Sequence, residues 1–281
     1  MSTDDILSKT PPPADARIAY GSDPHQFGDL RIPKGPDHYP TATEVIPSEP
    51  VPARGRRGRV EGPASPLAIV IHGGFWRARY DLVHAGHLCA ALTKAGIATW
   101  NLEYRRVGDS GGGWPGSLQD IAAAVRFVPR LAKLAPLDTR RVIVIGHSAG
   151  GHLALTIAAH ESALDAVIAL APISDLRRAH ELHLSNDAVV EFLGGTPSQV
   201  PEHYSQASPM ELEIASSQIL IHGKADDIVP IAMSRSYVEH KQRRKEKMSL
   251  EELECGHFEL IDPSSTAWEH VQRAALSLLG I

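Results

Sequence analysis

The chain has 281 residues, of which 43% are hydrophobic and 22% are charged, and its formal net charge is −5. That length accommodates one large α/β domain but not two, and the composition is typical of a soluble globular protein. The acidic balance argues against a general nucleic-acid binder, because such proteins present a basic surface.

The N-terminal residues show no pattern of a targeting segment. Residues 1–10 are polar and acidic without an apolar core, and the three prolines at 11–13 favour an extended conformation. We therefore expect a flexible segment over residues 1–16, no signal peptide, no membrane span and a cytoplasmic location. The two cysteines, Cys89 and Cys255, are too few for a disulfide framework, which also favours a reducing compartment.

Residues 17–65 divide into strand-like and loop-like parts. Apolar positions over 17–33 predict a hairpin-like pair of strands at the edge of a sheet. Residues 34–65 are rich in proline, glycine and charge, and predict a loop around one strand at 41–46. The run 54–59 holds four arginines and is interpreted as a solvated loop tip rather than an anion or partner site.

A buried strand and a glycine-rich loop come next. Residues 67–72 form a continuous apolar run that ends in a histidine, as expected for a strand buried on both faces, and Gly-Gly-Phe-Trp follows at 73–76. A helix is predicted over 83–94, closed by Gly96, and a strand over 97–102. The loop that follows, 103–116, carries three consecutive glycines and a Trp-Pro pair.

The middle of the chain alternates between helices and strands. Ser117 and Asp120 predict a capping box at the start of a helix, which Pro129 should kink or end. A strand over 141–145, a helix over 149–159 and a buried strand over 166–170 follow.

The last third contains an irregular segment and then returns to alternation. Residues 173–210 are polar without clean periodicity and predict a small cap-like insertion, whereas strands are predicted over 217–222 and 248–253. Helices are predicted over 230–243 and 266–279. This alternation predicts an α/β fold in which a mostly parallel central sheet has helices on both faces, as a single domain over 17–281.

The motif Gly-His-Ser-Ala-Gly at 146–150 lies between a predicted strand and a predicted helix. A serine at such a turn is the arrangement of a nucleophile elbow, in which the small neighbours let the chain close tightly. The elbow would present the Ser148 hydroxyl at the end of the sheet and therefore predicts a nucleophile.

A serine hydroxyl is a weak nucleophile until a base removes its proton, and the base needs an orienting acid. In this class of fold the chain order is serine, acid, histidine. His257 follows the last predicted strand, and Asp226 follows the preceding one, three residues after Gly223. We predict Ser148, Asp226 and His257 as the catalytic residues, with Asp227 as the alternative acid.

An oxyanion would be held by backbone N–H groups. In this arrangement one donor follows the nucleophile and the others come from the loop after an earlier strand, so we predict Gly74, Phe75 and Ala149, with Gly73 next. His72 is expected to hold that loop by hydrogen bonds rather than to carry protons.

Aromatic residues are concentrated in loops expected near the site, although they make up only 5% of the chain. We predict Trp76, Tyr104, Trp114 and His152 as substrate-binding residues, which would suit a flat or apolar substrate. The alternative is that Trp76 and Trp114 pack the loops. His147, like His152, flanks the serine and is expected to be buried or to line the site without direct catalysis.

Arg105 and Arg106 lie in the same loop region. Either could meet a substrate carboxylate, but we expect them to tie the loop to a carboxylate of the protein.

The chain resembles the α/β-hydrolase superfamily of serine esterases over about residues 17–281, on the strength of the segments 72–76 and 146–153 and of His257-Phe258. Within it, these segments and the opening 20–24 look like the kynurenine formamidase-like and feruloyl esterase-like branch. The resemblance implies the α/β-hydrolase fold. The long polar segment 34–65 departs from that branch.

The predicted triad leads to hydrolysis of a carboxylic ester of a small or medium soluble substrate through an acyl-enzyme intermediate. The alternatives are an arylformamidase or other amide hydrolase, and a non-catalytic protein that binds ligands. We expect no cofactor and no metal, because the histidines lack the spacing of a ligand set. We expect a small-molecule ester or amide as the partner, no nucleic acid, no membrane, and a monomer or homodimer.

Overall fold

The computed structural model describes residues 5–34, 45–46, 64–161 and 164–281. The basic run 54–59 and most of the strand predicted at 41–46 therefore lie outside the described residues. Part of the N-terminal segment that we expected to be flexible contacts the domain. Ile6 is buried in the core, and the carbonyl of Pro12 accepts a hydrogen bond from the Arg31 guanidinium at 2.8 Å.

The described strands form one nine-stranded sheet in the order β3-β1-β2-β5-β4-β6-β7-β8-β9. The strands are β1 (Ala16–Ala19), β2 (Phe27–Arg31), β3 (Val45–Ile46), β4 (Ser65–Ile71), β5 (Ala98–Leu102), β6 (Leu137–His147), β7 (Ala166–Leu170), β8 (Ser217–Gly223) and β9 (Met248–Leu253). Strand β2 is antiparallel to β1 and to β5, and every pair from β5 to β9 is parallel. The sheet is thus mostly parallel, as predicted, with the expected hairpin near one edge.

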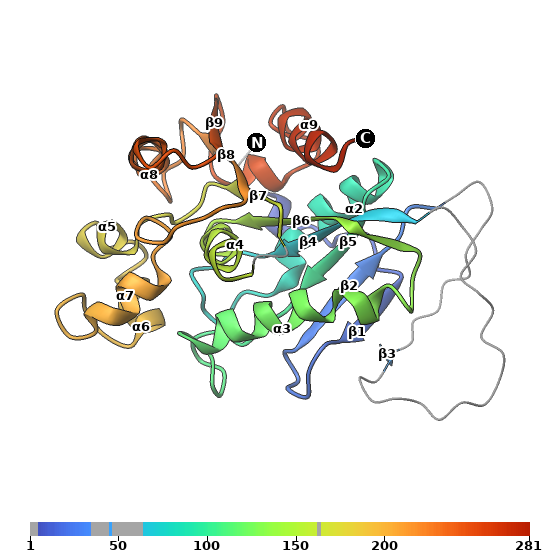
Figure 1. Cartoon of the computed structure of the whole chain (residues 1–281), viewed down its shortest axis with the longest axis horizontal. Helices are drawn as coiled ribbons and strands as arrows, with labels where there is room; N and C mark the ends of the chain where they lie inside the picture. The colour runs from blue at the N-terminus through green and yellow to red at the C-terminus, as the bar shows by residue number, and fades with distance from the viewer. Residues whose placement is uncertain (1–4, 35–44, 47–63, 162–163) are drawn as a thin grey trace.

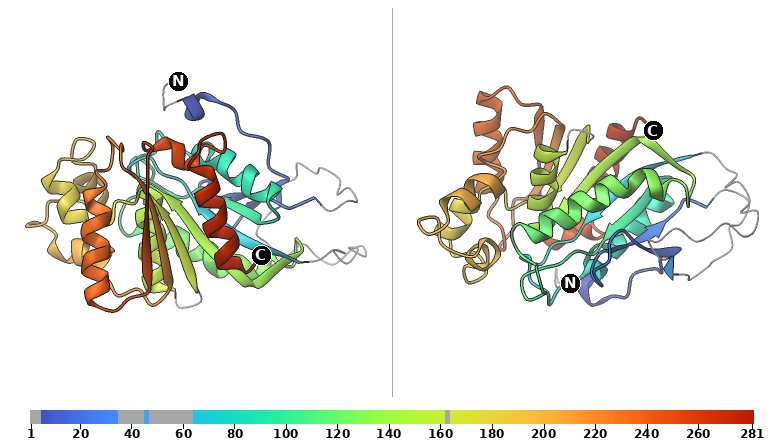
Figure 2. Two further views of the ribbon diagram at one scale, coloured as in Figure 1. Left: turned by 90° about the horizontal axis from the view of Figure 1, so that it is seen from above. Right: turned by 60° about the horizontal axis from the view of Figure 1, so that its bottom comes forward.

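Helices cover both faces of this sheet (Figure 1). They are α1 (Asp5–Ser8), η1 (Leu82–Ala85), α2 (Gly86–Lys94), α3 (Gly116–Leu131), α4 (Ala149–His160), α5 (Leu176–Glu181), α6 (Ala188–Leu193), α7 (Pro201–Ala207), α8 (Ala232–Arg243), η2 (Phe258–Ile261) and α9 (Trp268–Leu279). In Figure 2, α8 and α9 lie on opposite sides of the C-terminal strands. Of the helices in the part of the chain that the structure describes, none has the length and apolar character needed to cross a membrane.

The hydrophobic core consists of two layers, one on each face of the sheet. Alternate residues of β4 show this directly, because successive side chains of a strand point to opposite faces. Leu67, Ile69 and Ile71 pack with α3, α4 and α8, whereas Ala68 and Val70 pack with α2 and α9. All five are at most 1% exposed, which explains the continuous apolar run in the sequence.

The start of α3 corrects one prediction. Its N-cap is Pro115, and Ser117 is already inside the helix, so the predicted capping box does not form. The Ser117 hydroxyl instead donates to the carbonyl of Arg105 at 2.6 Å, and Asp120 accepts from the Arg105 side chain. Both residues therefore hold the loop before the helix. Pro129 does not end the helix, which continues to Leu131.

The predicted insertion at 173–210 contains the three short helices α5, α6 and α7, which lie together beyond α4 at one side of the molecule (Figure 1). The turn between α5 and α6 is conformationally unusual. His183, Ser185, Asn186 and Asp187 all have positive φ angles, between 49° and 56°. Such angles are unfavourable for residues other than glycine, so contacts with other parts of the protein must hold this turn.

A tight approach of α4 to β4 gives the first prediction. A Cβ atom on Gly150 would lie 2.1 Å from the carbonyl oxygen of Ile71 and 2.5 Å from that of His72, both of which are backbone atoms that cannot move aside. We expect Gly150→Ala to lower the free energy of unfolding by about 3 kcal/mol or more, measured by urea denaturation. The matched control is Gly151→Ala in the same helix, where the nearest contact is 3.0 Å from the Pro172 side chain. Equal stability of the two variants would contradict this explanation.

Candidate active site

The serine of the central motif sits at the turn between β6 and α4. Ser148 separates the last residue of β6, His147, from the first residue of α4. Its φ of 58° and ψ of −120° are strained for a residue with a side chain. A Cβ atom on Gly146 would lie 2.1 Å from the carbonyl oxygen of Gly150, so the turn requires glycine at 146, whereas Gly150 is required by its approach to Ile71. The sequence therefore folds locally as a nucleophile elbow.

Asp226 and His257 meet from two neighbouring loops. Asp226 follows β8, His257 follows β9, and His257 Nδ1 lies 2.6 Å from Asp226 Oδ2. The two side chains are 0% and 3% exposed. Because a carboxylate only accepts, Nδ1 carries the hydrogen and Nε2 is left as the basic atom.

Further donors surround the Asp226 carboxylate. Its Oδ1 accepts from the backbone N–H groups of Ile228 and Val229, at 2.9 and 2.8 Å, and His222 Nε2 lies 3.2 Å from Oδ2. Burial by itself raises the pKa of Asp226, but the hydrogen bonds from His222 and His257, with the charge on His257, lower it well below its usual range. The acid therefore stays ionised beside the imidazole.

The structure distinguishes between the two adjacent aspartates. The Asp226 side chain is buried against His257, whereas Asp227 is exposed. Sequence reasoning did not find the contact of His222 with Asp226, because nothing in the local sequence pattern indicates it.

His147 connects the serine turn with the loop that carries His257. His147, the residue before Ser148, has its Nε2 3.0 Å from the carbonyl oxygen of His257, and the two imidazole rings are 4.4 Å apart. Among the described residues, no hydrogen bond joins the Ser148 hydroxyl to the His257 imidazole. Catalytic hydrogen bonds are often long in structures without substrate and tighten when it binds. The structure thus brings Asp226 and His257 into contact and places Ser148 next to them.

The loop after β4 runs beside the serine. A Cβ atom on Gly73 would lie 3.1 Å from the Cβ atom of Ser148, and Gly74, Phe75 and Trp76 follow with φ angles of 108°, 51° and 57°. Within the described chain, no backbone or side-chain acceptor takes the N–H groups of Gly74, Phe75 or Ala149. Such unpaired donors next to a serine are suited to binding an oxyanion.

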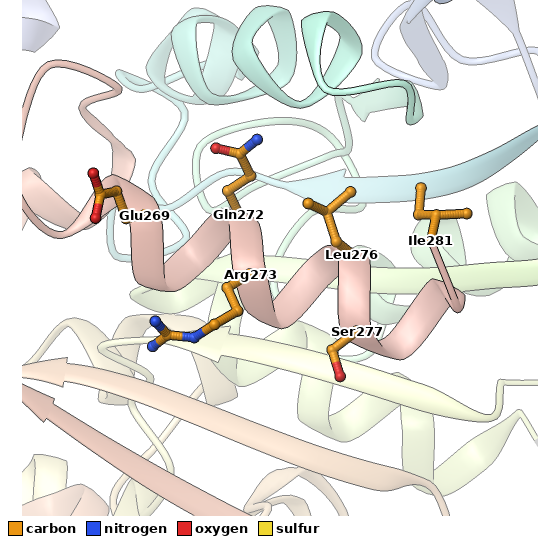
Figure 3. Close-up of a pocket in the computed structure, with 6 residues that line it drawn as sticks. All are labelled: Glu269, Gln272, Arg273, Leu276, Ser277 and Ile281. Atoms are coloured by element: carbon orange, nitrogen blue, oxygen red, sulfur yellow. The ribbon is translucent and has the colours of Figure 1, made fainter.

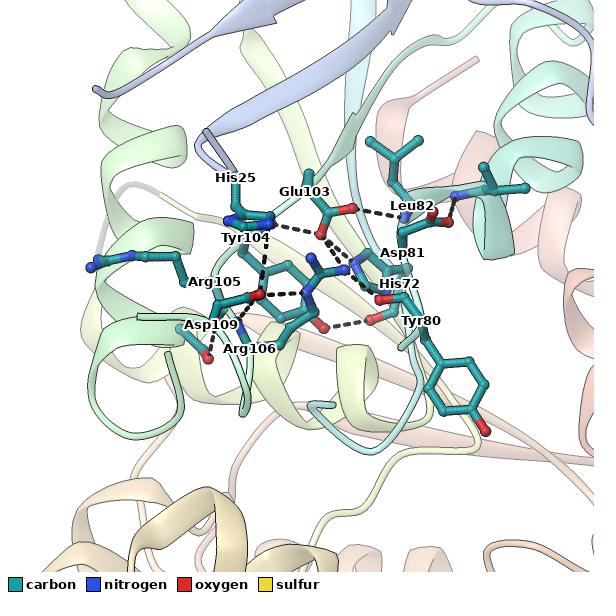
Figure 4. Close-up of polar contacts among 12 residues, drawn as sticks. His25, His72, Tyr80, Asp81, Leu82, Glu103, Tyr104, Arg105, Arg106 and Asp109 are labelled. Carbon is teal, nitrogen blue, oxygen red and sulfur yellow. Dashed lines mark hydrogen bonds and ion pairs between the residues drawn. The ribbon is translucent and has the colours of Figure 1, made fainter. Parts of the chain in front are cut away.

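A buried polar network supports this loop from behind (Figure 4). His72 Nδ1 lies 2.8 Å from the carbonyl oxygen of Gly73, and its Nε2 lies 3.1 Å from Glu103 Oε1. Arg106 Nη1 lies 2.9 Å from the same carboxylate oxygen. Burial by itself raises the pKa of Glu103, but His72 and the charge of Arg106 keep it below its usual value. His72 thus holds the loop in place, as expected.

Both arginines of the neighbouring loop are paired within the protein, as expected. Arg105 Nη2 lies 2.6 Å from Asp120 Oδ1, and Arg106 bonds Asp109 and Glu103. Neither guanidinium is therefore left free for a substrate carboxylate.

Three residues that we predicted to bind substrate are buried instead. Trp76, Tyr104 and His152 are at most 1% exposed, and their polar atoms are bonded within the protein. Trp76 Nε1 donates to His152 Nδ1 at 3.1 Å, and the Tyr104 hydroxyl donates to the carbonyl of His72 at 3.0 Å. They support the glycine-rich loop and the insertion 173–210 rather than forming an open binding surface. Trp114, which is half-buried, keeps its place as a candidate contact.

Sequence reasoning missed a link between the glycine-rich loop and the insertion 173–210. Arg77 donates through Nε and Nη2 to the Glu191 carboxylate, at 2.8 and 3.0 Å, and through Nη1 to the Ser185 hydroxyl at 3.0 Å. The Trp76 ring stacks on Phe192 of α6, with centroids 4.6 Å apart. These contacts hold the unusual turn before α6 against the loop beside the serine.

Among the described residues, no three histidine, cysteine, aspartate or glutamate side chains are grouped to hold a metal ion. A pocket of about 350 Å³ on α9 is lined by residues from Glu269 to Ile281, which Figure 3 shows, and contains none of the predicted site residues.

Comparison with known proteins identifies a family match and two curated relatives. The family model described as BD-FAE matches residues 58–240. Esterase LipC of Mycobacterium tuberculosis is 24% identical, in a match that covers 89% of this chain and 61% of LipC. Esterase LipQ of the same organism is 26% identical, over 63% of this chain and 45% of LipQ. The chain thus spans roughly half to three fifths of the length of these relatives.

Solved structures match over nearly the whole chain. A truncated carbohydrate esterase from gut microbiota is 19% identical with a TM-score of 0.75, covering 97% of this chain and all of that one. Esterase B from Lactobacillus rhamnosis, bound to an inhibitor, is 18% identical with a TM-score of 0.74, covering 99% and 91%. At these identities the likeness shows the fold, and the predicted α/β-hydrolase fold is confirmed.

The buried His152 gives a prediction about stability and pH. Burial lowers the pKa of His152 from 6.5 to about 3, so between these values the unfolded chain binds the extra proton and stability falls as the pH falls. Between pH 7 and pH 5 this one group should lower the free energy of unfolding by about 2 kcal/mol. From pH 7 to pH 5, the free energy of unfolding measured by urea denaturation should therefore fall by about 2 kcal/mol more in the wild type than in His152→Gln. Parallel stability curves would show that His152 is not a buried neutral group.

Proposed function

The chain belongs to the BD-FAE family, and we propose that it is a serine hydrolase that cleaves carboxylic esters of small or medium-sized substrates. The observation that carries the proposal is the buried hydrogen bond of 2.6 Å between Asp226 and His257, next to a serine in a nucleophile elbow. The activity of the two relatives named as esterases supports the same chemistry.

The proposed first step is attack by Ser148 Oγ on the carbonyl carbon of the ester. His257 Nε2 takes the hydroxyl proton as the new C–O bond forms, and Asp226 stabilises the resulting imidazolium through Nδ1–H. The tetrahedral intermediate collapses, His257 returns the proton to the leaving alcohol, and an acyl-serine remains. Water, activated by the same nitrogen, then releases the acid and restores Ser148.

The negative charge of the tetrahedral intermediate would lie on the former carbonyl oxygen. We assign its stabilisation to the N–H group of Ala149 and to those of Gly74 and Phe75. These groups have no acceptor in the described chain, and the network around Glu103 fixes the loop that carries two of them before substrate arrives. Donors fixed in this way need no reorganisation during the reaction, which is the main source of their effect.

Two substrate classes, esters and aryl formamides, differ in the leaving group that this site would release. The same three residues could cleave an aryl formamide, which is the chemistry of the kynurenine formamidase-like branch that the sequence resembles. We favour esters because the relatives and structural neighbours named above are called esterases. The half-buried Trp114 is the candidate contact for the substrate. Its ring centroid lies 6.4 Å from that of Phe192, which stacks on Trp76 in the glycine-rich loop.

The triad proposal predicts unequal effects of two adjacent acids. Ser148→Ala should lower kcat/KM for a short-chain nitrophenyl ester by roughly 10⁴-fold or more, and Asp226→Asn should lower kcat by about 10⁴-fold because the amide cannot stabilise the imidazolium. Asp227→Asn is the matched control and should change kcat less than about twofold, since its side chain is exposed. Steady-state kinetics measures all three. If Asp227→Asn were as impaired as Asp226→Asn, the assignment of Asp226 as the catalytic acid would be contradicted.

The substrate class is tested by a panel of short-chain nitrophenyl esters and N-formylkynurenine. We expect kcat/KM for the best ester to exceed that for the aryl formamide by at least about tenfold. A preference for the formamide would replace the ester proposal by the amide alternative. No turnover of either, together with failure of an active-site serine probe to label Ser148, would favour a non-catalytic protein.

A further inference from the structure

Two histidines outside the proposed triad form a hydrogen-bonded pair that ends on the base. His84 Nε2 lies 2.9 Å from His147 Nδ1, and His147 Nε2 lies 3.0 Å from the backbone carbonyl oxygen of His257. The ring centroids of His84 and His147 are 5.1 Å apart. The pair thus connects the helical turn η1 with the loop that carries the base.

The chemistry of the final acceptor fixes the direction of these hydrogen bonds. A carbonyl oxygen can only accept, so His147 carries its hydrogen on Nε2. Its Nδ1 is then an acceptor, and His84 must donate to it from Nε2. Burial lowers the pKa of His147 well below its usual value and that of His84 to about 3, so both rings stay neutral near neutral pH.

Both ends of this connection are held firmly. At one end, Leu82 of η1 donates its backbone N–H to Glu103 Oε2 at 3.1 Å, and its carbonyl accepts from the Asn101 side chain at 2.7 Å. Glu103 is the carboxylate that also holds His72 behind the glycine-rich loop. The turn that carries His84 is therefore anchored to the same carboxylate as the proposed oxyanion donors.

At the other end, Phe258 packs against the three imidazoles. Its ring centroid lies 6.1 Å from that of His84, 6.1 Å from that of His147 and 5.1 Å from that of His257. His147 also directly precedes Ser148 in the chain, so its side chain bonds the base loop while its backbone leads into the elbow. One residue therefore relates the positions of nucleophile and base.

We propose that His84 and His147 are positioning residues for the reaction, which together fix the backbone of His257 relative to Ser148. The inference rests on the proposed function, because the two histidines would set the distance from Ser148 Oγ to His257 Nε2 over which the proton is transferred. His84 acts by fixing the ring orientation of His147, and His147 acts by holding the carbonyl of His257. Neither residue exchanges a proton with the substrate.

The test replaces the donor of His84 in two ways. In His84→Gln the side-chain amide nitrogen can occupy the place of Nε2 and donate to His147, whereas His84→Leu fills similar space without a donor. We expect the leucine variant to lose roughly 10- to 100-fold in kcat with KM for a nitrophenyl ester changed less than about threefold, since small displacements of reacting groups have effects of this size. The glutamine variant should keep kcat within about threefold of the wild type.

Two further measurements separate positioning from general support of the fold. The rate at which a fluorophosphonate labels Ser148 should fall in the leucine variant and be restored in the glutamine variant, while thermal unfolding confirms that both are folded at the assay temperature. If the leucine variant does not fold, His84→Asn, whose shorter amide cannot reach His147, replaces it with the same expected loss.

Three results would count against the proposal. Wild-type kcat in the leucine variant would overturn it, as would equal losses in the glutamine and leucine variants. A wild-type protein that hydrolyses no ester would remove the proposed function and this inference with it, whereas an active wild type with unaffected variants would remove only the inference.

Discussion

The parallel direction of four strands is the constraint on which the site depends. Strands β4, β6, β8 and β9 all run the same way, so the turns that follow them meet at one edge of the sheet. Those turns carry the glycine-rich loop, Ser148, Asp226 and His257 respectively. Residues that are up to about 185 positions apart in the chain are thus brought together by the layered packing alone. Both faces of the sheet must be buried for this edge to form, and the two core layers meet that requirement.

Backbone strain is concentrated at this edge and in the insertion 173–210. Nine non-glycine residues of the described chain have positive φ angles, and seven of them lie in the glycine-rich loop, at Ser148 or in the turn 183–187. Each such conformation costs on the order of 1–3 kcal/mol and persists only where surrounding contacts determine it. Arg77 provides those contacts for the turn, and the network of His72, Glu103 and Arg106 provides them for the loop. Stability elsewhere in the fold therefore supports a fixed arrangement of donors beside the serine.

Much of this arrangement could be predicted from local patterns in the sequence. An apolar run predicted β7 and an alternating pattern predicted β9, both at their observed bounds. The order of serine, acid and histidine along the chain predicted that Asp226 and His257 meet. Ser117 and Asp120 were misjudged because their partner, Arg105, lies in the preceding loop and competes with the helix terminus. The burial of Trp76, Tyr104 and His152 could not be predicted either. The hydrogen bonds that bury them join residues 32 to 76 positions apart, and a local pattern of apolar residues cannot indicate such long-range pairs.

The proposed reaction requires Ser148 and His257 to act on one another. It is tested most directly by a crystal structure of the protein after reaction with a small alkyl phosphonate. We expect a covalent bond from Ser148 Oγ to phosphorus, with the phosphonyl oxygen accepting from the N–H group of Ala149 and from that of Gly74 or Phe75. We also expect His257 Nε2 to lie within hydrogen-bonding distance of the adduct. Attachment at another residue, or an imidazole that remains beyond reach of the bonded serine, would contradict it.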